Sequence, residues 1–274
     1  MSDSLQPSGP TLAPPDLAPH YERIVLDRHL KAGRALVEAL AVKAGEHVLE
    51  LGCSTGLLSE HLADRVGPTG DVLGLDALPM RIQIAHQKVR PNLRFQIGHA
   101  QALGRFPRGC FDVICANAVL RGVPDHAAVL AELHRLLRPG GRLGVVEASA
   151  DHPHPALLVQ RGVLAEPPYN AHAAPAEAQE WRLNAAALQA ALQAAGFADV
   201  LLRSEPDVSV HASANAAIEF VQAGAWGRFL QYLPEPLRRQ ARAEIVARLD
   251  WLRVSDGIHH DGVRLVALAS KARD

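Results

Sequence analysis

The residues from Val48 to Ser59 constrain the fold of this chain most strongly. An apolar run from Val48 to Leu51 is typical of a buried parallel strand. It passes into a turn of small residues, and the turn opens into a helix with Leu57 and Leu62 on one face. A strand, a glycine-rich turn and a helix form the first part of a nucleotide-binding βαβ unit.

The turn itself indicates how a ligand could be held. Gly52 allows a sharp turn and a close approach of a ligand to the backbone, and Ser54 or Thr55 is expected to cap the helix. Free N–H groups at the start of a helix suit a carboxylate or a phosphate. A dinucleotide fingerprint would need glycines where Ser54 and Leu57 stand, so the pattern is E-x-G-x-x-x-G, with Glu50 before the first glycine.

A second buried strand is predicted from Asp71 to Asp76, about twenty residues after the glycine turn. A carboxylate at the end of this strand can accept hydrogen bonds from both hydroxyls of a ribose. The alternative is that Asp76 caps the next helix, for which Pro79 suits the first turn. The spacing and the strand end together favour the ribose role.

The following residues continue the alternation of strands and helices. A leading helix is predicted over 21–42, with His20 and Tyr21 at its start facing either the site or the solvent. The further predicted elements are a helix over 80–89, strands over 93–98, 111–117 and 141–146, a helix from Pro124 that stops at Arg138-Pro139-Gly140-Gly141, a helix over 184–195, and strands over 200–210 and 263–270.

Five sequence marks occur in this order between residues 47 and 148. They are the acid–glycine turn, Asp76, Phe111-Asp112-Val113-Ile114, Leu120-Arg121-Gly122-Val123-Pro124-Asp125, and Arg138-Pro139-Gly140-Gly141. Together they resemble the class I S-adenosylmethionine-dependent methyltransferases, and the last two resemble the ubiquinone/menaquinone-biosynthesis group. The family more often has glycine where Ser54 stands, and an acid that binds the adenine amino group where His99 stands.

The resemblance implies an α/β fold: a doubly wound, Rossmann-like, seven-stranded sheet whose last strand is antiparallel. It also implies S-adenosyl-L-methionine as the cofactor, with Gln101 or the Ala100 amide serving the adenine in place of an acid. The cofactor-binding residues that it assigns are Glu50, Gly52, Cys53, Ser54, Gly56, Asp76, Ala77, His99, Ala100, Gln101, Asn117 and Arg121.

The domain organisation is predicted from composition. The first twenty residues contain five prolines and no Lys or Arg, so 1–20 is expected to be a disordered lead-in without a secretory signal, and 21–274 a methyltransferase domain. The residues over 151–180 are expected to form a long loop with short helices. A helical lid is predicted over 211–260, as two helices over 214–223 and 237–252. Its aromatics form either an apolar substrate pocket or the core of the lid itself: Phe220, Trp226, Phe229, Tyr232 and Trp251.

No catalytic residue can be assigned from the sequence, and methyl transfer needs alignment more than a protein nucleophile. Asn117 is followed by Ala-Val-Leu rather than Pro-Pro-aromatic, which argues against amino groups of DNA bases as targets. Oxygen, carbon or sulfur of a small, apolar or aromatic molecule is the expected acceptor. Arg121 either touches cofactor or acceptor or pairs with Asp125. The candidate general bases are His152, His154, His172 and His211, each more simply explained as a surface histidine.

Composition sets the remaining expectations. A formal net charge of −1 gives no reason to expect a nucleic-acid partner, and no apolar run reaches the length of a membrane span. The three cysteines form no disulfide framework; Cys110 and Cys115 are expected to be buried thiols, and the chain to be cytoplasmic. No metal is expected, and the oligomeric state is not predicted. The alternatives to a methyltransferase are a non-catalytic S-adenosylmethionine-binding protein and an NAD-dependent oxidoreductase.

Overall fold

A computed structural model describes residues 27–174, 179–224 and 230–273, and the predicted lead-in over 1–20, His20, Tyr21, Trp226 and Phe229 lie outside them. Seven strands form one sheet in the order β3-β2-β1-β4-β5-β7-β6. The strands from β1 to β5 are parallel, and β7 is antiparallel to both β5 and β6. The predicted fold class, including the antiparallel last strand, is therefore confirmed.

The strands are β1 (His47–Leu51), β2 (Asp71–Asp76), β3 (Leu93–Ile97), β4 (Phe111–Asn117), β5 (Leu137–Ala148), β6 (Ala198–His211) and β7 (Ile258–Ser270). The helices are α2 (Asp27–Ala39), α3 (Leu57–Val66), α4 (Pro79–Ala85), α5 (His126–Leu136), α6 (Pro155–Leu164), α7 (Ala185–Ala194), α8 (Ala214–Gly224) and α9 (Glu235–Asp250). Short 3-10 turns follow at His86–Lys88, Leu120–Gly122 and Tyr169–Ala171.

Both faces of the parallel part of the sheet are buried, as the continuous apolar strands predict. Val48 and Val113 point to the face covered by α2, α3 and α4, and they belong to one apolar core. Leu49 and Ile114, the next residue of each strand, point to the other face and pack with α5 and α7. Helices on both faces leave the carboxyl ends of the strands as the edge where loops can build a site.

The predicted limits of two elements are wrong. The Arg138-Pro139-Gly140-Gly141 stretch is an irregularity inside β5 rather than a turn after the helix, because α5 already ends at Leu136 and the β4–β5 register shifts before Arg142. The segment 151–180, expected to be a loop with short helices, contains α6 and the short turn over Tyr169–Ala171 among its described residues. The last strand, β7, begins at Ile258 rather than at Val263, so the connection between β6 and β7 is shorter than 211–260.

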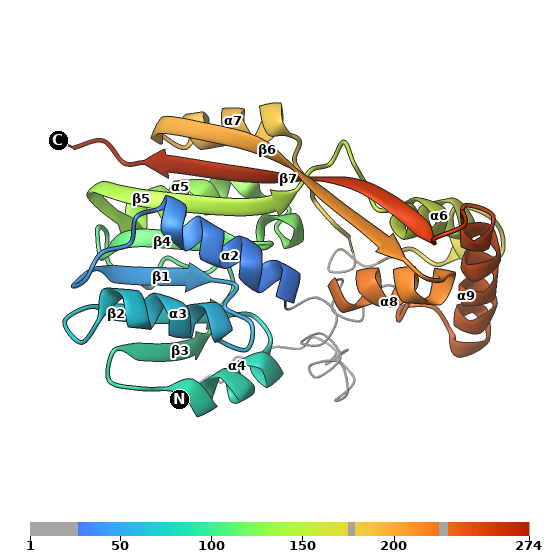
Figure 1. Ribbon diagram of the computed structural model, residues 1–274, viewed down its shortest axis with the longest axis horizontal. Helices are drawn as coiled ribbons and strands as arrows, with labels where there is room; N and C mark the ends of the chain where they lie inside the picture. Colours follow the sequence, from blue (N-terminus) through green and yellow to red (C-terminus); the bar gives the residue numbers. More distant parts are fainter. Residues whose placement is uncertain (1–26, 175–178, 225–229, 274) are drawn as a thin grey trace, which may run out of the picture.

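Strands β6 and β7 continue beyond the sheet as a two-stranded ribbon. β5 pairs with β7 only as far as Arg264, whereas β6 and β7 remain paired to His211 and Ile258. At the far end of this ribbon α6, α8 and α9 pack together around a third apolar core, which includes Ile218 and Ile245. Figure 1 shows these three helices, here called the helical subdomain, set apart from the sheet at the end of the ribbon.

The predicted lid aromatics do not act as one group. Phe220 and Tyr232 are partly buried against the core of the helical subdomain, whereas Trp251 is 88% exposed after the end of α9. Of the three predicted lid aromatics that the structure describes, two therefore pack the core of the subdomain and one faces solvent.

Candidate functional site

The turn after β1 is held in a conformation that needs glycine. Gly52 has φ +76°, and a Cβ there would lie 2.4 Å from Cγ2 of Val119. The N–H groups of Gly52 and Cys53 both donate to the carbonyl of Leu75, at 2.7 and 2.9 Å, and so tie the turn to the end of β2. This pairing keeps the turn close against the sheet edge.

Ser54 has φ +52°, in the left-handed region that favours glycine. This geometry gives a physical reason why a glycine would suit the position. The expected capping of the helix by Ser54 or Thr55 is wrong, because α3 begins after Gly56 and has no side-chain cap. The Ser54 and Thr55 hydroxyls are instead buried and meet no hydrogen-bond partner in the described part of the chain.

A pocket opens at this turn, and five of the predicted cofactor residues line it: Glu50, Gly52, Cys53, Ser54 and Asn117. Five further residues of the lining were not predicted: His29, Leu30, Thr55, Leu57 and Leu58. Three of these residues line the pocket because they adjoin the turn in the sequence: Thr55, Leu57 and Leu58. His29 and Leu30 come from α2, more than twenty residues before the turn, and only an amphipathic pattern could have indicated them.

Glu50 is the buried acid of this pocket. Its carboxylate accepts a hydrogen bond from the Ser59 hydroxyl and is 3% exposed. Burial raises the pKa of Glu50 to about 8, with a further contribution from the negative charge of Asp76. A buried carboxyl of this kind would be stabilised in its charged form by a cationic group placed in the pocket.

His29, from α2, also lines the pocket. The Asn117 side chain donates to its carbonyl at 2.9 Å, which fixes α2 against the end of β4. Burial lowers the pKa of His29 to about 3, and the charges of Arg121, Arg28, Arg81 and Arg264 add to this effect. The imidazole is therefore neutral at physiological pH.

Asp76 lies at the end of β2 and is 2% exposed. Its Oδ2 accepts from the Ser54 N–H at 3.0 Å and its Oδ1 from the Leu78 N–H at 2.8 Å. Arg81, another residue that the sequence did not single out, places Nη1 3.7 Å from Oδ2. Each carboxylate oxygen retains a second lone pair for a ligand hydroxyl.

The remaining predicted residues do not line this pocket. Gly56 faces the Phe95 ring, and Ala77 directly follows Asp76 at the end of β2. His99 and Gln101 are exposed, while Ala100 packs into the core beside them. Arg121 lies close to the carboxylates of Glu147 and Glu180 and influences the pKa of both, rather than acting on Asp125, which caps α5 through the Ala128 N–H.

The four candidate bases differ in position. His154 and His211 are buried and bonded to each other, Nε2 to Nε2, at 2.9 Å. His152 is exposed, and His172 follows the turn over Tyr169–Ala171. In the described residues no group of three His, Cys, Asp or Glu has the arrangement of a metal site.

The donor set of the pocket fits the amino-acid end of S-adenosylmethionine. That group carries an ammonium and a carboxylate, and the pocket offers one buried carboxyl and two buried hydroxyls that have no partner in the part of the chain that the structure describes. The adjoining Asp76 is at the position expected of a ribose ligand. The residues present therefore accommodate the cofactor that the sequence predicts.

Comparisons with known proteins show the family of this chain. A family model described as a methyltransferase domain matches residues 42–196. A demethylmenaquinone methyltransferase of Lactobacillus johnsonii is 37% identical over 142 residues, which are 48% of this chain and 58% of that protein. The chain thus matches little more than half the length of this relative.

Solved structures are similar to the whole fold. The YcgJ protein of Bacillus subtilis has a TM-score of 0.60 at 18% identity, covering 90% of this chain and 100% of that one. A phosphoethanolamine N-methyltransferase of Haemonchus contortus, in complex with S-adenosylhomocysteine, has a TM-score of 0.59 at 13% identity, covering 94% and 57%. With the family match over more than half of its length, the chain belongs to the methyltransferase-domain family, as a class I S-adenosylmethionine-dependent member resembling the menaquinone-biosynthesis enzymes.

Proposed function

We propose that this protein transfers the methyl group of S-adenosyl-L-methionine to oxygen, carbon or sulfur of a small, apolar or aromatic molecule. The observation that carries the proposal is the pocket at the Gly52 turn, which is lined by the buried Glu50 carboxyl and by Ser54 and Thr55, whose buried hydroxyls have no partner among the described residues. The family match over 42–196 supports the same activity.

Each wall of the pocket has a role in this proposal. Glu50 binds the ammonium of the cofactor, and the hydroxyls of Ser54 and Thr55 bind its carboxylate. Asp76 accepts the ribose hydroxyls, and the loop over 99–101 receives the adenine. When bound, the cofactor supplies a methyl group already activated for displacement. The task of the protein is then to align the acceptor and to exclude water.

In this proposal the acceptor binds beside the cofactor, and the helical subdomain acts as a lid that selects it. The name of the Lactobacillus johnsonii relative makes a quinone-like aromatic acceptor one candidate. Helices α8 and α9 lie beyond the residues that the family model matches, so acceptor choice is expected to differ from that of the relatives.

We also infer a cytoplasmic protein that needs no nucleic-acid partner. All three cysteines are free thiols, and the formal net charge is −1. Every helix in the described residues is too short or too polar to cross a membrane.

Calorimetric titration with S-adenosylhomocysteine tests the cofactor assignment, with NAD as the control. Micromolar binding of S-adenosylhomocysteine alone is expected. Because the ammonium would lower the raised pKa of Glu50, binding at pH 7 should release a proton, seen as a heat that depends on the buffer. Binding of NAD would favour the oxidoreductase, and binding without turnover on any acceptor would indicate a non-catalytic binding protein.

A further inference from the structure

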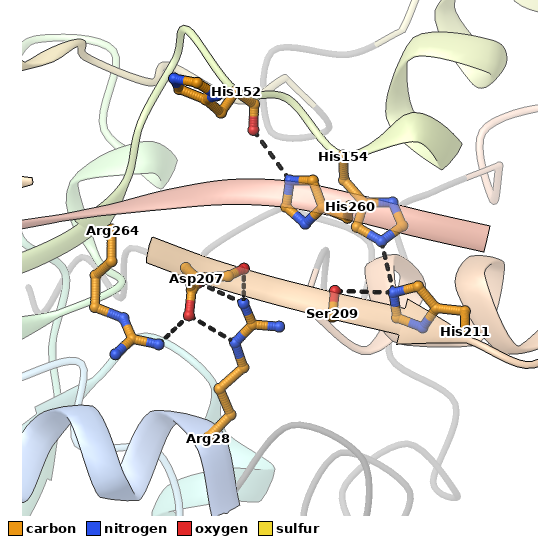
Figure 2. A network of polar contacts seen from close by, with 8 residues as sticks. All are labelled: Arg28, His152, His154, Asp207, Ser209, His211, His260 and Arg264. Carbon is orange, nitrogen blue, oxygen red and sulfur yellow. Dashed lines mark hydrogen bonds and ion pairs between the residues drawn. The ribbon is translucent and has the colours of Figure 1, made fainter. Parts of the chain in front are cut away.

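Helix α2, which contributes to the cofactor pocket, is held at both ends by arginine side chains. Just after its C-terminal end, Arg142 of β5 donates from Nε to the Leu40 carbonyl at 2.8 Å and pairs with Glu46 at 2.9 Å. At its N-terminal end, Arg28 of α2 itself reaches Asp207 of β6 (Figure 2). One end of the helix is therefore fixed to the parallel sheet and the other to the β6–β7 ribbon.

The contact between Arg28 and Asp207 is two-pronged. Arg28 donates from Nε to Oδ1 of Asp207 at 3.0 Å, and its Nη2 lies 2.7 Å from Oδ2. Nη2 also donates to the backbone carbonyl of Asp207. The two side chains are only 21% and 18% exposed, so solvent screens this pair less than it screens a surface pair. A contact of this geometry fixes direction as well as distance, and so fixes where α2 begins.

Asp207 also binds a second cation. Arg264 of β7 donates from Nη2 to Oδ1 of the same carboxylate (Figure 2). Two guanidinium groups thus share one carboxylate, and loss of its negative charge would leave Arg28 and Arg264 as neighbouring like charges. The Asp207 carboxylate therefore holds the start of α2 to both strands of the ribbon.

Arg28 also contacts the helical subdomain. Its guanidinium carbon lies 5.4 Å from the centre of the Phe220 ring of α8, within the range of a cation–π contact. Phe220 packs on the rings of His154 and His211, with centroids 5.5 and 5.0 Å away. These histidines are bonded to each other, and His154 caps α6 while His211 ends β6. The start of α2 therefore rests on a cluster of rings that joins α6, α8 and the ribbon.

The residue after Arg28 belongs to the cofactor pocket. His29 and Leu30 line that pocket, and the Asn117 side chain donates to the His29 carbonyl. Arg28 and His29 are consecutive residues of one helix, so a displacement of either moves the other. A continuous series of contacts thus runs from the cofactor pocket through the start of α2 to the ribbon and the helical subdomain.

We propose that Arg28 is a positioning residue that couples occupation of the cofactor pocket to the placement of the helical subdomain, through its ion pair with Asp207 and its contact with Phe220. The inference deepens the proposed methyltransferase function and rests on it. His29 and Leu30 hold the start of α2 in place when the pocket is filled, and Arg28 passes this constraint to the ribbon and to α8. Such coupling is reciprocal, so a loosened ribbon weakens cofactor binding.

Calorimetric titration of the full chain with S-adenosylhomocysteine measures the coupling. Asp207 and Phe220 are outside the lining of the cofactor pocket, yet Asp207→Asn and Phe220→Leu should each weaken the affinity by roughly fivefold, the low end of couplings between sites. Arg28→Met keeps a flexible stem without the guanidinium and should weaken the affinity at least as much. Asp207→Asn should cause no further loss in the Arg28→Met background, because both substitutions remove one contact.

Arg142→Met provides the matched control, because it loosens the other end of α2 by the same kind of substitution. The contacts of Arg142 are with Leu40, Ala41 and Glu46. The affinity of this variant for S-adenosylhomocysteine should remain within about twofold of the wild type.

A second measurement needs no variant. The methyl resonance of Ile218, in the core of the helical subdomain, should shift in the wild type when S-adenosylhomocysteine binds. The same resonance should not respond in Arg28→Met saturated with the ligand. Thermal unfolding shows which of the variants are folded.

Four results would overturn the inference. They are unchanged affinity in folded Arg28→Met or Asp207→Asn, additive losses in the double variant, an Ile218 resonance that does not respond in the wild type, and an equal loss of affinity in Arg142→Met. The last result would mean that any loosening of α2 has the same effect. Failure of the wild type to bind S-adenosylhomocysteine would instead overturn the proposed function.

Discussion

Replacement of Glu50 by glutamine is expected to stabilise the protein while weakening cofactor binding. In the folded chain burial raises the pKa of this carboxyl from 4.5 to about 8. Folding therefore takes up a proton between these two pH values. The free energy of unfolding must fall as the pH rises through this window, because the unfolded chain is ionised there and the folded chain is not.

The size of the effect follows from the pKa values. A pH of 7 is about 2.5 units above the ordinary pKa of the carboxyl in the unfolded chain. This difference corresponds to about 3 kcal/mol of lost stability. At pH 5.5 the loss is only about 1.4 kcal/mol by the same relation. Glutamine has no such titration, and its carbonyl can still accept from the Ser59 hydroxyl.

Urea unfolding of the wild type and Glu50→Gln at pH 5.5 and 7 measures this directly. The advantage of the variant should grow by about 2 kcal/mol between the two conditions. Well below pH 4.5 the side chain is neutral in both proteins, folded and unfolded, which provides the internal control. The reasoning is refuted if the difference in stability between the two proteins does not change with pH. Titration of the variant with S-adenosylhomocysteine should show at least a tenfold weaker affinity, the loss of one charged partner.

Three further substitutions test the turn and its neighbour. Asp76→Ala should weaken S-adenosylhomocysteine binding by roughly ten- to 150-fold in calorimetry, and unchanged affinity would disprove the ribose assignment. Gly52→Ala should lower the free energy of unfolding in urea by more than Gly67→Ala, because both have positive φ but only Gly52 has a side chain, Val119, in the way of a Cβ. Ser54→Gly should change the free energy of unfolding by less than about 1 kcal/mol. Glycine relieves the strain of the left-handed backbone, but it also increases the conformational entropy of the unfolded chain. A larger loss in the same assay would show that the Ser54 hydroxyl stabilises the turn.

The sequence predicted the described elements correctly where neighbouring residues determine the local structure. The strand from Val48, the glycine turn and the helix from Leu57 form as predicted because the apolar period and the turn residues are local signals. The limits of β7 were missed for a physical reason. Residues 259–262 are His-His-Asp-Gly, with no apolar side chain among them, so they lack the alternation that marks a strand.

The chemistry of the site was only partly accessible. Glu50 and Asp76 could be identified because their distance from the glycine turn is fixed by one βαβ unit. His29 could not, since its place in the pocket depends on how α2 packs against the ends of β1 and β4.

The sequence by itself determined the βαβ unit, the sheet class and the family of this protein, because these depend on local periodicity and on spacing within about a hundred residues. Only the tertiary structure decided that Glu50 would be a weak acid, since its pKa depends on burial by distant elements. It likewise decided that His154, His211 and His260 would meet, because contacts between residues so far apart arise from the packing of the ribbon and the helical subdomain.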